Sequence, residues 1–220
     1  FLEEDEWNYV ALISDKDGVT LYVNQELARR DVLLNSTTLG TMKIGSYKGW
    51  GDRNFNGEID EVAIWDRALT EEEIRNTRHL TKTIDDFSGL YAYYQFNEGK
   101  GTTIKDLTSN GNNGAFAVST PPDWSTDCPI GSYGKPRCSS IKLDGTADYV
   151  VVPDDPSLVV STGVTMEAWV YYTGGPFTNM IMNKEGEYHM GIIPNNFTWS
   201  VANTTPGWST QGTGINIPKS

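Results

Sequence analysis

Three carboxylates stand close together in the segment 58–65, which reads EIDEVAIW. Its β-branched and aromatic residues predict a β-strand, in which every second side chain lies on the same face. Glu58 and Asp60 then share one face, and Glu61 points to the opposite face. Paired carboxylates about 5–5.5 Å apart hydrolyse glycosidic bonds, and carboxylate oxygens also bind Ca²⁺. This strand is therefore the first place at which the chain could carry out chemistry.

Other catalytic signatures are missing from the sequence. It contains no nucleophile elbow, P-loop, H-E-x-x-H motif or dinucleotide fingerprint. Only two histidines occur, His79 near the end of a predicted helix and His189 within a predicted strand. Both are expected to be solvated or packed. The lack of a catalytic constellation favours a binding or structural module over an enzyme.

The only two cysteines, Cys128 and Cys138, flank a loop rich in Gly and Pro. Such a loop can bring its ends together, which predicts a disulfide and an oxidising compartment. The alternative is a pair of reduced loop thiols, because two cysteines are too few for a structural zinc site. Three glycosylation sequons support an extracellular chain, and their asparagines are Asn35, Asn196 and Asn203.

The net charge limits the kinds of partner. A formal charge of −12 argues against nucleic acid, because phosphate binding needs a basic stripe. It also disfavours docking on anionic membranes. No apolar run approaches the ~20 residues of a membrane-spanning helix, so membrane insertion is not expected. An acidic surface is compatible with calcium and neutral glycans, and it also serves solubility.

The pattern along the chain predicts an all-β protein with one helix. Short alternating runs separated by turn residues predict roughly a dozen strands. The helix is predicted over residues 71–78, because Thr70 and Glu73 can form a capping box and the first turn is acidic. Residues 120–135 read as the longest irregular stretch. The expected strands cover residues 7–13, 19–23, 27–34, 42–47, 58–65, 90–96, 141–152, 165–172, 180–183, 188–193 and 198–202.

Several motifs resemble one known family. Residues 55–65 (FNGEIDEVAIW) and 66–74 (DRALTEEEI) resemble the closing strand and terminal helix of laminin-G-like, concanavalin A-like jelly rolls. Residues 90–99 (LYAYYQFNEG) resemble the opening strand of the same family, and 143–150 with 165–170 resemble its next two strands. The resemblance covers nearly the whole chain. It implies a two-sheet antiparallel jelly-roll sandwich whose C-terminal half precedes its N-terminal half.

This order divides the chain into a C-terminal half at 1–80, a connector at 81–89 and an N-terminal half at 90–220. Three arrangements remain open. The chain closes on itself as a permuted domain, it is one period of a tandem array, or each half completes a neighbouring chain, so that the assembly propagates head to tail. Half a sandwich leaves a sheet face uncovered and strand edges unpaired, so the halves are expected to find partners.

The resemblance also carries expectations about sites. Laminarinase-type glucanases share this jelly roll and place their carboxylates as E-x-D-x-E or E-x-D-x-x-E. Here Val62 or Ala63 stands where the second Glu is needed, so no catalytic residue and no enzymatic activity is predicted. The resemblance further implies a structural calcium ion where the opening strand meets the closing strand. Its ligands would be Asp60, Asn97, Glu98 and Asp106; the alternative is that Asp60 caps a turn and Glu98 is solvated.

The tryptophans fall into two groups. Trp7, Trp65 and Trp169 lie in apolar strand contexts and are expected in the core. A second group lies in loops rich in Gly, Pro, Ser and Thr. These residues are candidates for ligand binding, with packing within their own loops as the alternative, and they are Trp50, Trp124 and Trp208.

These observations predict a non-catalytic, extracellular or cell-surface module of laminin-G-like type with a structural or adhesive role. It would be a repeat or subunit of a surface fibre or adhesin that associates with itself or with neighbouring repeats. The alternative is a calcium-stabilised, lectin-like module that binds carbohydrate. A glycoside hydrolase is the third class, and Val62 and Ala63 disfavour it.

Overall fold

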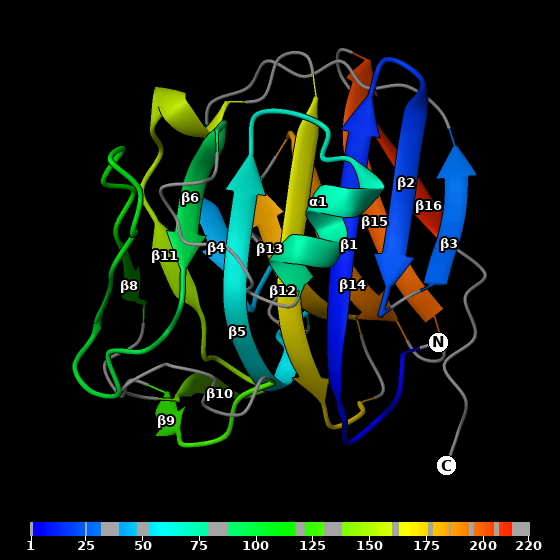
Figure 1. Ribbon diagram of the computed structural model, residues 1–220. Helices are drawn as coiled ribbons and strands as arrows, with labels where there is room; N and C mark the ends of the chain where they lie inside the picture. The colour runs from blue at the N-terminus through cyan, green and yellow to red at the C-terminus, as the bar shows by residue number, and fades with distance from the viewer. Residues whose placement is uncertain are drawn as a thin grey trace.

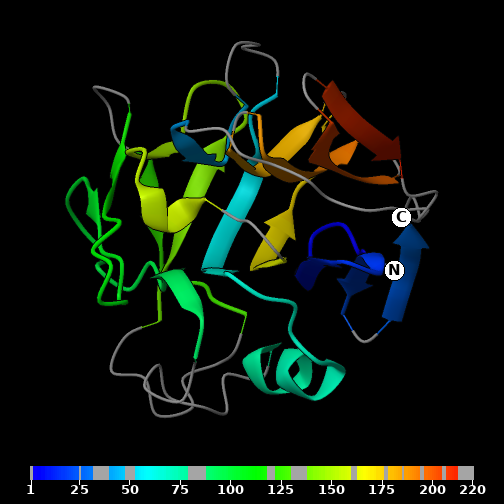
Figure 2. The same cartoon turned by 90° about the horizontal axis from the view of Figure 1, so that it is seen from above.

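A computed structural model describes most of the chain. The described residues are 2–24, 26–31, 40–47, 53–78, 88–117, 122–129, 138–159, 163–175, 178–184, 186–193, 196–204 and 207–212. They form two antiparallel sheets that pack face to face, with one α-helix outside them (Figures 1 and 2). The predicted all-β jelly-roll sandwich is confirmed.

The first sheet is built around the strand that carries the carboxylates. Its strands run in the order β3-β2-β1-β12-β5-β10-β9, and β6 also pairs with β5. The bounds are β1 (Trp7–Asp15), β2 (Gly18–Val23), β3 (Glu26–Asp31), β5 (Asn56–Trp65), β6 (Leu90–Tyr94), β9 (Asp123–Ser125), β10 (Ser140–Asp144) and β12 (Val164–Tyr172).

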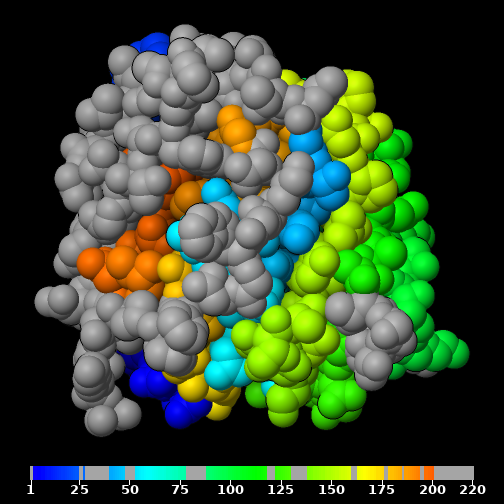
Figure 3. Space-filling model, turned by 180° about the vertical axis from the view of Figure 1, so that it is seen from behind, coloured from blue at the N-terminus to red at the C-terminus, as the bar shows by residue number. Residues whose placement is uncertain are grey.

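The second sheet has the order β16-β15-β14-β13-β4-β11-β8-β7. Seen from behind, residues near β4 (blue) lie between those near β11 (yellow-green) and those of β13–β15 (orange) (Figure 3). The bounds are β4 (Met42–Ile44), β7 (Thr103–Ile104), β8 (Gly114–Phe116), β11 (Val150–Val152), β13 (Asn179–Lys184), β14 (Tyr188–Ile193), β15 (Asn196–Thr204) and β16 (Gly207–Gly212).

The main core lies between the two sheets. β5 contributes Ile59, Val62 and Ile64, which are fully buried. They meet apolar side chains from both sheets. Burial of this surface stabilises the sandwich, at about 25 cal/mol for each Å² of apolar area. The largest aromatic members are Phe55, Tyr94, Phe96, Tyr188, Phe197 and Trp199.

The predicted helix is present as α1 (Glu71–Arg78) and lies on the outer face of the first sheet (Figure 1). Its capping box forms as expected: the Glu73 N–H donates to Thr70 Oγ1 at 3.2 Å, and the Thr70 N–H donates to Glu73 Oε2 at 2.8 Å. Ile74 of the helix joins a second, smaller apolar cluster on this outer face. Its other buried members are Tyr9, Ala11, Ile13, Ala63, Trp65, Leu69 and Tyr93.

Strands from residues 1–80 and from residues 90–220 are neighbours in both sheets. β1 and β5 both pair with β12, which lies between them, and β4 pairs with β11 and β13. Some expectations about local structure were wrong. Residues 141–152, expected as one strand, form β10 and β11, which lie in different sheets. Residues 123–125, expected to be irregular, form β9 against β10, with Trp124 opposite Ile141. The pairing partner lies 17 positions along the chain, so local turn signals do not reveal it.

Candidate functional site

The carboxylates of β5 lie on one face, contrary to the expectation for Glu61. A register shift against β12 between Glu167 and Trp169 adds one residue to β5 at this point, and Glu61 has a φ of 51°. Such a β-bulge breaks the two-residue alternation. Glu61 therefore joins Glu58 and Asp60 on the outer face, while Val62 returns to the core.

The bulge sits where β5 changes partners. β10 pairs with residues 56–59 of β5, and β6 pairs with residues 62–65 on the same edge. Between these two ladders, Glu61 accepts a hydrogen bond from the hydroxyl of Tyr93, which in turn accepts one from Gln95 Nε2 at 3.0 Å. Burial, followed by the negative charge of Glu61, raises the pKa of Tyr93 well above its ordinary value.

The other two carboxylates are also engaged by neighbours. Asp60 Oδ1 accepts the backbone N–H of Glu61 at 2.8 Å, and Glu58 Oε2 accepts the hydroxyl of Ser140 at 2.7 Å. Asp60 and Glu61 expose only 2% and 3% of their surface. Both carboxyl groups are therefore largely shielded from solvent.

Asp106, a predicted calcium ligand, instead organises a loop. Its Oδ1 accepts the N–H groups of Tyr93 at 3.0 Å and Thr108 at 2.9 Å. Its Oδ2 accepts the Thr108 hydroxyl and the Asn112 N–H, both at 2.8 Å. Four donors to one carboxylate hold the loop after β7 against the opening strand β6. The side chain is thus occupied by its own loop.

Two further predicted calcium ligands, Asn97 and Glu98, lie in the segment after β6. Glu98 Oε1 accepts the Lys105 N–H at 2.8 Å, while its Oε2 is buried without a hydrogen-bond partner. Asn97 is half-buried. Within the described residues, no group of three or more His, Cys, Asp or Glu side chains could hold a metal ion. A calcium ion at Asp60, Asn97, Glu98 and Asp106 stays a prediction.

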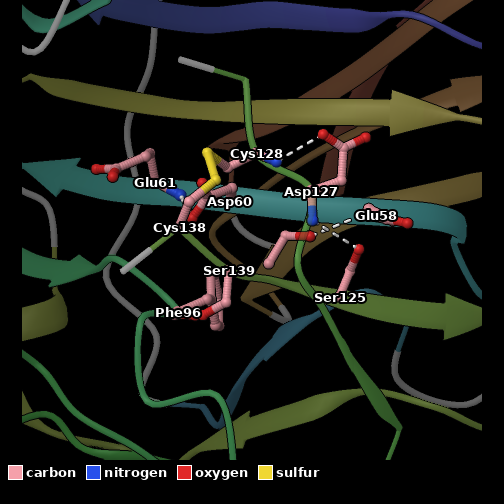
Figure 4. Close-up of a disulfide and its surroundings, with 10 residues drawn as sticks. Glu58, Asp60, Glu61, Phe96, Ser125, Asp127, Cys128, Cys138 and Ser139 are labelled. Carbon is pink, nitrogen blue, oxygen red and sulfur yellow. Dashed lines mark hydrogen bonds between the residues drawn. A yellow bond between two sulfur atoms is a disulfide. The ribbon is translucent and has the colours of Figure 1, made fainter. Parts of the chain in front are cut away.

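The predicted disulfide is present. Cys128 and Cys138 are bonded, with their Cα atoms 5.8 Å apart. Figure 4 shows the disulfide and the segment around Asp127 over β5, near Asp60 and Glu58. The Cys128 N–H donates to Asp127 Oδ1 at 2.8 Å, and the Ser139 hydroxyl donates to the Phe96 carbonyl at 2.5 Å. The disulfide thus ties two chain segments together beside the carboxylates.

The tryptophans expected in loops are only partly described. Trp124 is half-buried, packs edge-on against Phe116 with ring centroids 5.7 Å apart, and donates to the Gly101 carbonyl at 3.3 Å. Trp124 thus contacts residues of other segments rather than only its own loop, and a role in ligand binding stays a prediction. Trp50 lies outside the described residues. The backbone of Trp208 belongs to β16, and its side chain lies outside the description.

Two of the tryptophans expected in the core are elsewhere. Trp65 is buried as expected, with 1% exposure. Trp7 and Trp169 are half-buried on the outer face of the first sheet. Their strands have apolar or aromatic residues on both faces, because helix α1 covers part of the outer one. Sequence context therefore could not separate the two faces.

Glu167, which the sequence reasoning did not single out, lies buried beneath α1. It accepts hydrogen bonds from the hydroxyl of Tyr9 and from the Trp65 indole N–H, the latter at 2.9 Å. Tyr9 Oη also lies 3.4 Å from Thr77 Oγ1 of α1. Burial is the main cause of a raised pKa for Glu167. The sequence did hold a signal for this buried carboxylate, because Glu167 is a charged residue in the middle of the apolar run 164–172.

The glycosylation sequons remain predictions. Asn196 is the first residue of β15 and is half-buried. Asn203 belongs to the same strand, but its side chain is outside the description, and Asn35 lies outside the described residues. Within those residues, no helix is long and apolar enough to cross a membrane.

Comparison with known proteins bears on the N-terminal third of the chain. Residues 2–75 match the model of the concanavalin A-like lectin/glucanases superfamily, Laminin_G_3. No curated protein and no solved structure matches the chain. The matched segment contains β1–β5 and the first residues of α1, including the motifs at 55–74. Over residues 2–75 the chain is therefore similar to the concanavalin A-like lectin/glucanases superfamily.

Proposed function

We propose that the chain is a non-catalytic, extracellular recognition module with an adhesive or structural role, and that its copies or neighbouring repeats associate head to tail. The family match supports a lectin-like or adhesive module. The disulfide between Cys128 and Cys138 supports an oxidising compartment. Such modules bind glycans or other proteins, and the features of this chain favour a protein partner.

The observation that carries the proposed association is the edge strand β3. Among the described strands, β3 pairs only with β2. The other edge of β3 therefore has no strand beside it within the described residues. Leu27 on β3 exposes 58% of its surface. Among the described residues, no other large hydrophobic side chain is exposed. An open edge with exposed apolar surface favours pairing with another chain. Among the described strands, β9 forms the opposite edge of the same sheet, so contact between β3 and β9 of successive copies would extend the sheet.

Substitution of Leu27 by Lys tests this association. Sedimentation velocity over a range of concentrations should show multimers of the parent chain, and L27K should raise the concentration needed for assembly by about tenfold or more. The control is A147K, which adds the same charge at an exposed turn residue. A parent chain that stays monomeric, or an L27K variant that assembles like A147K, would contradict the proposal.

The absence of catalysis is supported by the state of the carboxylates on β5. Asp60 and Glu61 are buried, and Glu61 is hydrogen-bonded to Tyr93. We expect no release of reducing ends when the chain is incubated with a soluble β-glucan. The control variant is E72Q, which alters an exposed carboxylate on α1. Release of reducing ends that is lost in E58Q but retained in E72Q would contradict the proposal.

A further inference from the structure

Aromatic and acidic side chains form rows across the outer face of the first sheet. In the strand register, Trp7 lies opposite Tyr171, which in turn lies opposite Glu58. One step along the strands, Trp169 lies opposite Tyr9 on one side and Asp60 on the other. Side chains opposite each other in neighbouring strands lie on the same face and in contact range. The rows therefore continue the outer face beyond the area that α1 covers.

The three half-buried aromatic residues of this area are Trp7, Trp169 and Tyr171. Trp7 packs edge-on against Tyr171 with ring centroids 5.9 Å apart, and Trp169 packs in the same way against the buried Tyr9 at 5.6 Å. The indole N–H groups of Trp7 and Trp169 are buried and without a hydrogen-bond partner. The exposed surface of Trp7 and Trp169 therefore comes from atoms other than the indole nitrogen. A partner can therefore contact the exposed carbon atoms of these rings but not their N–H donors.

Four carboxylates act on this aromatic area. The pKa of Tyr171 is raised first by burial and then by the negative charges of Asp5, Glu6, Asp127 and Glu58. Asp5, Glu6 and Asp127 are exposed, and Glu58 is half-buried. Among the described residues, the exposed Lys142 lies opposite Glu58 in the register of β10 with β5 and places a positive charge beside these carboxylates. Four negative charges outnumber this positive charge. We call the three aromatic residues and these four carboxylates the aromatic–acidic surface.

Two of its acidic segments are held in place. The Asp5 N–H donates to the Tyr172 carbonyl at 2.9 Å, which fixes the residues before β1 against the end of β12. Asp127 is adjacent to the disulfide, and its N–H donates to Ser125 Oγ at 3.1 Å. The backbone of both segments thus needs little ordering when a partner arrives, which lowers the entropic cost of binding.

We propose that the aromatic–acidic surface binds the ammonium or guanidinium groups of a Lys- and Arg-bearing segment of a protein partner. Aromatic faces attract cations through their quadrupole, and the surrounding carboxylates add complementary charge. A neutral glycan would use the aromatic faces but would gain little from four negative charges. The inference rests on the proposed recognition function and names the chemistry of its partner.

The test uses hexa-arginine amide as the probe and tryptophan fluorescence with isothermal titration calorimetry as the readouts. The parent chain should bind the peptide, and the affinity should fall as NaCl is raised from 50 to 300 mM, because salt screens the charges. The W7L/Y171L variant should weaken binding by about tenfold. The D5N/E6Q variant should weaken it to a similar extent and should also reduce the dependence on salt.

The matched control is E71Q/E72Q, which removes the same charge from exposed residues of α1. It should bind like the parent. Equal losses in D5N/E6Q and E71Q/E72Q would show non-specific attraction to an acidic protein and overturn the proposal. So would salt-independent binding of a neutral oligosaccharide without peptide binding. If the peptide does not bind but L27K still disrupts assembly, this inference fails and the proposed association stands. Circular dichroism spectra of all variants should match the parent.

Discussion

At the scale of single residues, the buried Glu167 links the helix to the sheet. Two donors, Tyr9 and Trp65, meet its carboxylate, and only 4% of the surface of Glu167 is exposed. Burial disfavours the charged form and raises the pKa, while the two hydrogen bonds act in the opposite direction. The folded state therefore holds the proton more tightly than the unfolded state. The stabilisation due to this group is present at low pH and is lost as the pH rises through the raised pKa.

The variant E167Q removes this titration and keeps one acceptor oxygen. We expect the free energy of unfolding of the parent to decline, relative to that of E167Q, as the pH rises above the ordinary value of 4.5. Urea unfolding between pH 4 and 8 measures the difference. The control is E72Q, because Glu72 is exposed on the same helix. Parallel pH profiles for the parent and E167Q would show that Glu167 does not titrate abnormally.

A second buried charge lies at the hairpin of β13 and β14. Lys184 Nζ lies 2.6 Å from Glu187 Oε1, and both side chains are fully buried. Removal of one partner leaves a charge in the interior, so K184M should cost about 3–5 kcal/mol of stability. The double variant K184M/E187L should recover most of this loss. A double variant as unstable as K184M would indicate that the pair is not the source of the loss.

At the scale of elements, α1 depends on its N-terminal cap. Arg67 is the main cause that lowers the pKa of Glu73 to about 2, and Thr70 contributes through hydrogen bonds. A lowered pKa gives stability that is present above the ordinary value of 4.5 and is lost as the pH falls toward 2. T70A should cost about 1 kcal/mol at pH 6 and T70S much less, because Ser keeps the hydroxyl group. Unfolding curves of both variants decide this, and equal losses would argue against the cap.

This helix was predictable because its signals are local, whereas the shape of β5 was not. Thr70 and Glu73 are three residues apart, and their pairing needs nothing else from the fold. The bulge at Glu61 depends on β12, β10 and β6 together. The prediction assumed a strict two-residue alternation along β5, and it therefore assigned Glu61 to the face opposite Glu58 and Asp60. The failed expectation for Trp7 and Trp169 has a similar origin, since a helix distant in sequence makes both faces of their strands apolar.

Across the molecule as a whole, both sheets depend on the pairing of two segments that are remote in sequence. The family match covers residues 2–75, but β1 and β5 within it complete their ladders with β12 and β10. The aromatic–acidic surface has the same dependence, because Trp7 comes from one segment and Tyr171 from the other. We propose that these pairs form within one molecule, as in a permuted domain, and that association between copies uses the outer edges of the first sheet.

Amide hydrogen exchange on a dilute, monomeric sample, followed by mass spectrometry, tests this pairing most directly. The account predicts that β1, β5 and β12 exchange together as the slowest group, and that their protection does not change on further dilution. If protection of β1 and β12 falls as the chain is diluted, the two segments pair between molecules. In that case the aromatic–acidic surface would belong to the assembly and not to the single chain.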